Sequence, residues 1–369
     1  MRGLSPNLNL SVAKQTRSGP SIPRMSKPRH PNCAVIPACA KSKLHILFLA
    51  KHALSDGRPD TVDGNHALYH HELRTTLEQI GLRVTAANSF AAIEGQPDAD
   101  FVIPLLNRAG FQNSEMLAPL LLTRQNMPFL GASPILRGFS DDKHLTKMAA
   151  RHRGVPTMDW QIYRRGAGPI DQPHFAAGQL VVKPNASSAS WGLSVVASWQ
   201  EARHHIEALQ AAGHDVIVEP YVPLIDIAVP VIGGAAREPW LLPPMAYMPD
   251  DPRRPRSYEE KRALIATADD PLVPVEDPWL MSRLERHTRA LVQEFWPFDY
   301  GRFEYRYDPV SDDLQFMEVN LSCNLWSRKT ISRSAATLGI DHATLVESIV
   351  AHSLQRQGLI AADVVELAA

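Results

Sequence analysis

Short apolar runs alternate with helical patterns after about residue 43. The run KLHILFLAKH predicts a buried strand, and LRVTAA and FVIPLLN predict two more. Between them, HALYHHELRTTLEQIG repeats leucines at roughly helical spacing before Gly81, and SEMLAPLLLTRQN predicts a second helix. Strands that alternate with helices favour a parallel sheet covered on both faces.

A second region of strands and helices extends to about residue 225. GFSDDKHLTKMAARHRG predicts a helix with Ser140 as its N-cap and Gly154 at its end. QLVVKP and DVIVEPYV predict strands on either side of a helix at 199–213. The remainder mixes strands such as AVPVIGG with a charged, proline-rich segment at 249–278. It ends in two long helices with a hairpin between them.

The predicted hairpin is RFEYRYDPVSDDLQFMEVN, residues 302–320. Strand side chains alternate between faces, so Glu318 and Asn320 point the same way, and a hairpin would bring Glu304 beside them. Grouped carboxylates repel one another unless a cation lies between them, and hard oxygen ligands of this kind suit Mg²⁺. A solvated hairpin face is the alternative that these residues alone leave open.

Composition narrows the class of protein. The chain has 369 residues, more than a single core usually holds, which predicts two or three domains. Its net charge of -1 provides no positive field for nucleic acid or an anionic membrane, and it has no run of eighteen apolar residues. Three cysteines give no disulfide framework, so we expect a protein of the reducing cytoplasm. The expected partners are small molecules, with neither nucleic acid nor a membrane among them.

Residues 1–42 differ in composition from the rest of the chain. They contain seven Lys and Arg but no Asp or Glu, and they are rich in Ser and Pro. Such a segment buries too little apolar surface to order itself, so we expect a disordered basic tail. A transit peptide, or upstream sequence preceding a start at Met25, would share this composition.

Two other groups of potential metal ligands are weaker than the hairpin. Cys33 and Cys39 have no matching pair, so a zinc site is not expected there. His66, His70 and His71 lack a fourth ligand nearby, and an exposed helix face is the favoured interpretation.

Several residues before the hairpin suit a nucleotide. In VVKPNASSASWG, small side chains would let backbone N–H groups approach phosphates and Lys183 would neutralise them, although a simple turn has the same composition. Glu219, at the end of the next strand, would accept the amino group of adenine, with the backbone of Tyr221 or Val222 along the ring edge. Asp226 would hold ribose hydroxyls. Each acid alone is also compatible with a surface position.

The order of these residues resembles that of the ATP-grasp superfamily, and the segments are most similar to the D-alanine–D-alanine ligase family. SDDKHLTKMAARHRGVPT is similar to the family's helix that begins with Asp-Lys, followed by a Gly-x-Pro step. VVKPNASSASWG has the length of its lysine-to-glycine loop. GRFEYRYDPVSDDLQFMEVN is similar to its metal-binding hairpin, with Gly-Arg-x-acid and then Glu-x-Asn. SAATLGIDHATLVESIV is similar to its closing helix pair. The resemblance covers roughly residues 44–355 and is strongest at 141–339.

This resemblance implies an α/β (α+β) ATP-grasp fold of three domains, with ATP between the central and C-terminal domains. The implied N-terminal αβ domain spans 43–138 and the central subdomain spans 139–225. The C-terminal subdomain, which carries the metal-binding hairpin, spans 226–369.

The family's roles can be carried over to three groups of residues. Those expected to bind ATP are Lys143, Lys183, Glu219, Tyr221, Val222 and Asp226. Those expected to hold two Mg²⁺ ions, with Mn²⁺ as an alternative, are Glu304, Glu318 and Asn320. Those expected to act in catalysis are Arg302, which faces the transferred phosphoryl group, Lys261 on a mobile loop, and Ser190 near the acyl site.

The acceptor side departs from the family's pattern. LAKHALSDG lacks the glutamate of the family's Gly-Gly-x-Ser-x-Glu turn, and LNRAGFQNSE replaces its His-Gly-x-x-Gly-Glu. Ala189 stands at the position of a family serine, Arg262 at that of a tyrosine, and LSCNLWSRKT follows Asn320 where the family has a glycine. These departures argue against D-alanine as the substrate. Arg328 and Lys329 suggest an anionic substrate, or they are a solvated helix start.

We therefore expect an ATP-dependent carboxylate–amine ligase that forms an amide through an acyl phosphate and releases ADP. One alternative is a phosphotransferase that uses the same ATP site, and another is a catalytically silent ATP-binding module. A homodimer is compatible with the sequence.

Overall fold

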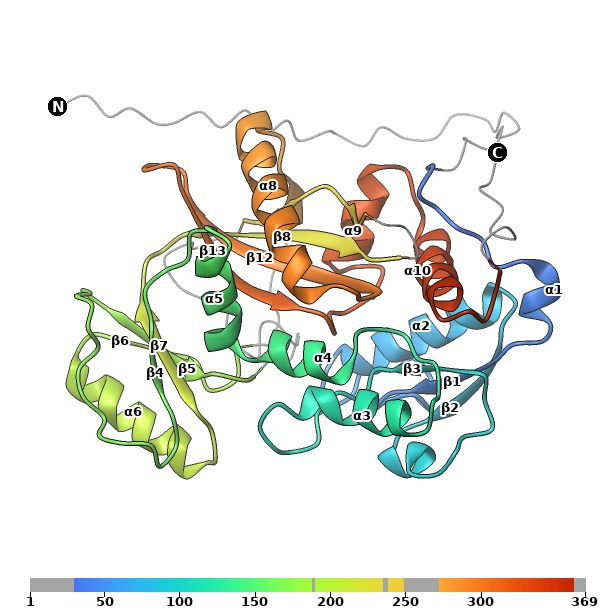
Figure 1. The fold of residues 1–369 in the computed structure, drawn as a ribbon, viewed down its shortest axis with the longest axis horizontal. Coiled ribbons are helices and arrows are strands. Elements are labelled where there is room, and N and C mark those ends of the chain that lie inside the picture. The colour runs from blue at the N-terminus through green and yellow to red at the C-terminus, as the bar shows by residue number, and fades with distance from the viewer. Residues whose placement is uncertain (1–29, 188–189, 235–237, 249–271, 362–369) are drawn as a thin grey trace.

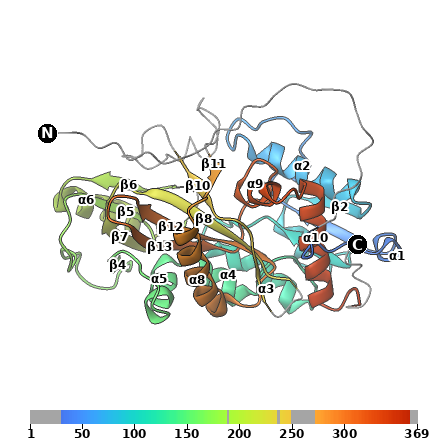
Figure 2. The ribbon, with the colours of Figure 1, turned by 90° about the horizontal axis from the view of Figure 1, so that it is seen from above.

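A computed structural model describes residues 30–187, 190–234, 238–248 and 272–361. Three sheets organise these residues and follow one another along the chain (Figure 1). Seen from above, the sheet around β7 and helix α6 lies at one end of the molecule (Figure 2). Helices α2 and α10 lie at the other end, and the strands of the third sheet lie between them.

The first sheet is parallel, in the order β2–β1–β3. Its strands are β1 (His45–Leu49), β2 (Arg83–Ala87) and β3 (Phe101–Pro104). The helices and 3₁₀ turns around it are α2 (His66–Gln79), η1 (Phe90–Ile93), η2 (Ser114–Met116), α3 (Leu117–Arg124) and α10 (His342–Arg356). Ile46 and Phe48 face a core shared with α2 and α10, whereas Leu47 and Leu49 face α3. The predicted parallel sheet, apolar on both faces, is confirmed.

The second sheet is antiparallel, in the order β4–β7–β5–β6. Its strands are β4 (Gln161–Tyr163), β5 (Leu180–Pro184), β6 (Ser194–Val196) and β7 (Val216–Pro220). Helix α6 (Trp199–Ala211) covers one face with Ala202, Ile206 and Leu209. The side chain of Ser198 caps this helix by accepting from the Glu201 N–H.

The third sheet carries the hairpin, in the order β11–β10–β8–β12–β13, with β9 on β8. Its strands are β8 (Ile225–Ile232), β9 (Trp240–Leu241), β10 (Met245–Tyr247), β11 (Leu272–Pro274), β12 (Tyr300–Asp308) and β13 (Asp313–Asn320). Helix α8 (Pro278–Phe295) packs on one face of this sheet, and α9 (Thr330–Thr337) precedes α10. The other face of the hairpin is left for the site.

The expected disordered tail is wrong for residues 30–42. Cys33, Ala34 and Ile36 are each 1% exposed and belong to the core of the first sheet. The Ala34 N–H donates to Ser348 and the Ile36 N–H donates to Glu347, both on α10. Helix α1 (Ala38–Lys41) follows. The segment has no periodic pattern of its own, and its order comes from these distant contacts.

The predicted N-cap at Ser140 is also wrong. Ser140 lies inside α4 (Pro134–Asp141), and its hydroxyl donates to the Arg137 carbonyl. The next helix, α5 (Lys143–His152), is capped by Asp142, whose side chain accepts from the Leu145 N–H. Gly154 follows α5 with a φ of +66°, a conformation that suits glycine.

One expected domain boundary interrupts a helix, and the other coincides with the start of a strand. The boundary after residue 138 lies inside α4, whereas the boundary after residue 225 lies at the start of β8. Helix α10 belongs by sequence to the last third, yet it packs in the core of the first sheet. No helix in the described ranges is both long and apolar enough to cross a membrane.

Candidate functional site

The hairpin brings its polar residues into register. Glu304 pairs with Glu318, and Arg302 pairs with Asn320, across antiparallel β12 and β13. Directly opposed residues point to the same face, and all four line one cavity. The opposite face, with Phe303 among others, is buried in the core beneath α8. The predicted two-strand hairpin and its shared polar face are confirmed.

Two cations accompany the opposed glutamates. Arg302 contacts Glu304 Oε1 through Nη2 at 2.6 Å and through Nε at 2.8 Å. Lys143 Nζ lies 3.5 Å from Glu318 Oε2. Burial alone would lower the pKa of Arg302, but Glu304 and Tyr247 outweigh it and raise that pKa above the ordinary value. Arg302 therefore stays charged.

Lys143 joins α5 to the small-residue loop. Its Nζ donates to the Ser187 carbonyl at 3.0 Å, and its backbone N–H donates to the Asn185 carbonyl. Asn185 Oδ1 in turn accepts from the His144 N–H at 2.9 Å. The loop that follows β5 is thus fastened to the N-terminus of α5, beside the hairpin glutamate Glu318.

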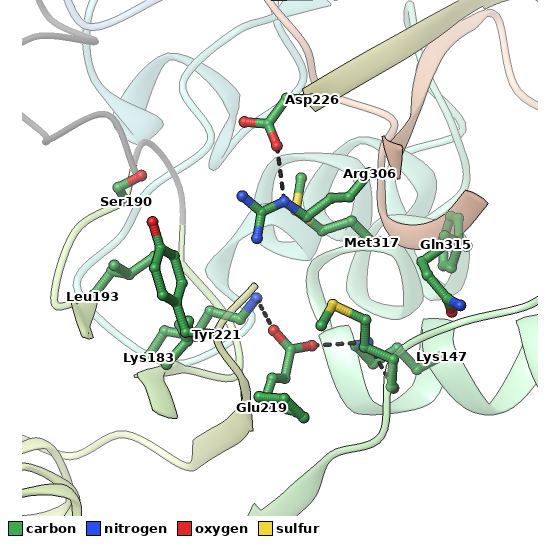
Figure 3. Close-up of a pocket in the computed structure, with 14 residues that line it drawn as sticks. Lys147, Lys183, Ser190, Leu193, Glu219, Tyr221, Asp226, Arg306, Gln315 and Met317 are labelled. Atoms are coloured by element: carbon green, nitrogen blue, oxygen red, sulfur yellow. Dashed lines mark hydrogen bonds and ion pairs between the residues drawn. The ribbon is translucent and has the colours of Figure 1, made fainter. Parts of the chain in front are cut away.

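Glu219, at the end of β7, lies between two lysines (Figure 3). Lys147 Nζ is 2.8 Å from Oε1 and Lys183 Nζ is 2.6 Å from Oε2. Burial alone would raise the pKa of Glu219, but the two lysines lower it to about 2. The carboxylate is therefore ionised in this arrangement, and both oxygens are in contact with cations.

The other residues expected at adenosine are only partly brought together. Tyr221 lies beside Glu219 (Figure 3). Its backbone N–H donates to the Gln179 carbonyl and is therefore not available to a ligand. Of the two backbone donors expected at the edge of the adenine ring, the Val222 N–H is the remaining candidate. The side chain of Val222 is 38% exposed and does not line the cavity around Glu219. Asp226 lines that cavity and is ion-paired with Arg306 at 3.0 Å.

Two adjoining cavities connect these groups. The smaller one lies around Glu219 and Tyr221, and the larger one, of about 540 Å³, extends over the hairpin to the first sheet. Lys183, Ser190 and Asp226 line both cavities. Ser190 has a φ of +61°. Lys261 and Arg262 lie outside the described residues.

The arrangement was compared with known proteins. No protein-family profile matches the chain. It is 29% identical over 240 residues to the uncharacterized protein y4sG of Sinorhizobium fredii, covering 63% of this chain and 69% of that protein. It is 26% identical over 248 residues to the D-alanine–D-alanine ligase of Desulfovibrio desulfuricans, covering 67% and 78% of the two chains.

Solved structures extend the comparison to the whole fold. The D-alanine–D-alanine ligase of Bacillus anthracis complexed with ATP superposes with a TM-score of 0.65 at 18% identity, covering 86% of this chain and 99% of that one. VanG D-Ala:D-Ser ligase of Enterococcus faecalis gives a TM-score of 0.62 at 11% identity, covering 84% and 99%. The chain has the ATP-grasp fold. The predicted fold and the resemblance to D-alanine–D-alanine ligases are confirmed, at low identity.

Two basic residues near the cavity around Glu219 were not predicted. Arg306 holds Asp226, and Lys147 holds Glu219. Lys147 stands four residues after Lys143 on α5, so both lie on one face of that helix. The spacing of four residues from Lys143 is the feature of the sequence that could have indicated a position near the site. It does not distinguish a lysine that points toward Glu219 from one that points to solvent.

Residues around the first sheet line the larger cavity, which was also not predicted from the sequence. Its lining residues from that side include Lys51, His66, Tyr69, His70, Asn107, Arg108 and Glu115. Arg108 contacts Glu115 at 3.1 Å and Asp141 at 3.1 Å. Asn107 Nδ2 donates to Ser322 Oγ at 3.1 Å, which links this side to the segment after the hairpin.

The three histidines of α2 do not act together as a metal set. His66 and His70 line the cavity, whereas His71 Nδ1 contacts the Ser55 carbonyl. In the described part of the chain, the group whose ligand atoms converge within 4.8 Å is His52, Asp60 and Asp63. Its Asp63 is already ion-paired, so this group is not a ready cation site.

The residues that follow the hairpin separate in space. Lys329 lines the larger cavity, but Arg328 is exposed and its guanidinium lies 5.5 Å from the centre of the Trp326 ring. Of the two cations suggested for an anionic substrate, Lys329 is therefore the one positioned to meet it.

Proposed function

We propose that this protein is an ATP-dependent carboxylate–amine ligase, similar to D-alanine–D-alanine ligases, that forms an amide through an acyl phosphate and releases ADP. One observation carries the proposal. Three cations, Lys143, Lys183 and Arg302, line the same cavity as the opposed glutamates of the hairpin. A site of this composition suits a triphosphate together with divalent metal, because each neutralises the other's charge.

ATP would span the two cavities. Lys143 and Lys183 would contact phosphate oxygens, and Arg302 would face the transferred phosphoryl group. Glu219 and the Val222 backbone would meet adenine, with the Tyr221 ring alongside. Asp226, oriented by Arg306, would meet the ribose.

The residues of the hairpin fit Mg²⁺. Glu304, Glu318 and Asn320 offer hard oxygen ligands on one face, and two carboxylates in direct opposition are favourable only when a cation lies between them. They would hold two Mg²⁺ ions, or Mn²⁺ in their place, with Glu318 shared between the ions. Bound there, the metal would neutralise charge on the phosphates.

The proposed chemistry has two steps. A carboxylate oxygen of the first substrate attacks the γ-phosphorus, the bond to the β-phosphate oxygen breaks, and ADP leaves with the electron pair. An amine then attacks the acyl carbon, the carbon–oxygen bond to phosphate breaks, and inorganic phosphate and a proton are released. The protein's residues orient the reactants and stabilise charge in both steps. Ser190 would lie near the acyl group and Lys261 would close over the phosphates.

The substrates are proposed to be small molecules, an amino acid or other carboxylic acid and an amine. D-Alanine and D-serine are the amino acids named for the relatives, but Lys51, His66 and Lys329 line this chain's acceptor side. We expect neither nucleic acid nor a membrane as a partner, and a homodimer remains compatible.

The test is ADP release in the presence of Mg²⁺, screened against D- and L-amino acids and small carboxylic acids. A ligase releases free phosphate only when both acid and amine are present. A phosphotransferase instead releases ADP and leaves a stable phosphorylated product. A silent ATP-binding module releases no ADP with any acid, and that outcome would refute the proposal.

A further inference from the structure

The buried carboxylate of Glu219 has more positive charge around it than its ionisation requires. It is 6% exposed, and each of its oxygens contacts a different lysine (Figure 3). One lysine would compensate the carboxylate, so the second gives the group a net positive charge. The two lysines therefore have distinct roles, and their surroundings show which is which.

Lys147 is fixed in place. Its side chain is 1% exposed, and its Nζ donates to Thr157 Oγ1 at 2.9 Å and to the Met158 carbonyl at 3.2 Å, in addition to contacting Glu219. Two of the three donors of its ammonium group make hydrogen bonds, and the ion pair with Glu219 adds a third contact. Moving Lys147 would break two hydrogen bonds and one contact with the buried carboxylate of Glu219.

Lys183 is held far less tightly. In the part of the chain that the structure describes, its Nζ forms an ion pair with Glu219. Lys183 also lines both cavities, the one around Glu219 and the one over the hairpin. Its ammonium can therefore exchange Glu219 for a phosphate oxygen at the cost of one contact.

We propose that Lys147 determines base specificity, by keeping Glu219 a hydrogen-bond acceptor when Lys183 leaves it for the phosphates of the nucleotide. This inference rests on the proposed ATP site. The released Oε2 would accept from the exocyclic amino group of adenine, in a cavity whose other walls include Leu193, Tyr221 and Met317. A 6-oxo purine would present a carbonyl to the same oxygen and would be repelled.

Removal of Lys147 would weaken this preference for a 6-amino purine. When Lys183 moves to the phosphates, Glu219 would be buried without a contacting cation, and such a carboxyl takes up a proton. Its OH would then donate to a C6 carbonyl. The other charged groups that line this cavity are Asp226 and Arg306, which are paired with each other. They leave Lys147 as the charge that holds Glu219 ionised.

The test is equilibrium binding of Mg·ATP and Mg·ITP to the full chain by titration calorimetry, because these nucleotides differ only in the C6 substituent and in the proton on the adjoining N1. We expect the wild type to prefer ATP by at least about tenfold, the scale of one hydrogen bond to a charged group. In Lys147→Met the preference should fall to about threefold or less. Thr157→Val is the matched control, because it removes one acceptor of Lys147 but no charge, and its preference should stay at the wild-type value.

A second measurement needs only the wild-type protein. Adenosine and inosine lack phosphates, so Lys183 stays on Glu219, and the difference in affinity with which the two nucleosides displace Mg·ATP should be smaller than the difference between the triphosphates. A nucleoside preference as large as the triphosphate preference would overturn the inference, as would an unchanged ATP preference in folded Lys147→Met. Absence of ATP binding to the wild type would instead refute the proposed function, and this inference with it.

Discussion

Glu304 and Glu318 lie directly opposite each other across the β12–β13 hairpin. Their neighbours Phe303 and Val319 point to the other face and pack in the core. Like charges in direct opposition destabilise a sheet. Arg302 and Lys143 offset part of that repulsion from one side each. The metal ions proposed above would offset the remaining repulsion, so the hairpin is the first place to test.

Glu318→Gln removes the carboxylate proposed to be shared by two metal ions and nearly preserves its shape. ADP formation at saturating Mg²⁺ should fall by at least about a hundredfold, the scale at which one group that stabilises charge matters. Steady-state ADP release measures the effect.

The matched control for that variant is Asp313→Asn, the same change of carboxylate to amide on the same strand. Asp313 is exposed, and its carboxylate accepts from Gln315. We expect near-normal ADP release from it. Near-normal release from Glu318→Gln as well would return the hairpin to a solvated face.

The hairpin could be predicted from sequence because its information is local. Period-two alternation within 302–320 predicts which side chains share a face on each strand. The register shifts by one residue between Glu304 and Tyr305, and this irregularity, which the alternation does not predict, places Glu304 opposite Glu318. The parallel sheet of β1, β2 and β3 was also predictable from a local pattern, because its strands alternate with helical segments.

The contacts that could not be predicted join residues far apart in the chain. Lys147 lies on α5 and Glu219 on β7, so their contact joins two separate elements and no periodicity predicts it. Residues 33–36 were expected to be disordered because the composition around them is basic and rich in proline. Their burial depends on α10, more than three hundred residues later.

Glu219 should leave a signature in acid stability. Its pKa is about 2 in the folded state against an ordinary value of 4.5, so its contribution is present above about pH 4.5 and is lost as the pH falls toward 2. Between those values the unfolded chain binds a proton that the folded chain does not. The free energy of unfolding should therefore fall by up to about 1.4 kcal/mol per pH unit on this account.

Urea unfolding between about pH 5 and pH 3 measures that slope. Glu219→Gln should show a shallower slope than the wild type, whatever its stability at neutral pH. Glu207→Gln, on the exposed face of α6, should keep the wild-type slope. Equal slopes in the wild type and Glu219→Gln would contradict the assigned ion pairs.

The N-terminal segment allows a comparison of two truncations. A chain that starts at Met25 keeps the buried side chains of Cys33, Ala34 and Ile36, and its melting temperature should match that of the full chain. A chain that starts at Ser42 loses them, together with two backbone hydrogen bonds to α10. Its free energy of unfolding should fall by about 3 kcal/mol or more, chiefly from the buried Ile36 and Cys33. A loss of stability in the first truncation would show that residues 1–24 contribute native contacts.

Lys329 and Arg328 are adjacent in sequence but differ in position, which gives the acceptor site a matched pair of variants. Lys329 lines the larger cavity and Arg328 lies over Trp326 in solvent. If the second substrate carries an additional carboxylate, Lys329→Ala should raise the KM for that substrate by roughly tenfold, the value of one charge-assisted contact. The KM for ATP should change little, because the residues proposed to bind the nucleotide lie toward β5 and β7. Arg328→Ala should leave both constants near the wild-type values.

Dicarboxylic amino acids or acids should accordingly be used better than D-alanine by the wild type. Equal use of D-alanine, or a defect in Arg328→Ala equal to that in Lys329→Ala, would show that the anionic group is recognised elsewhere.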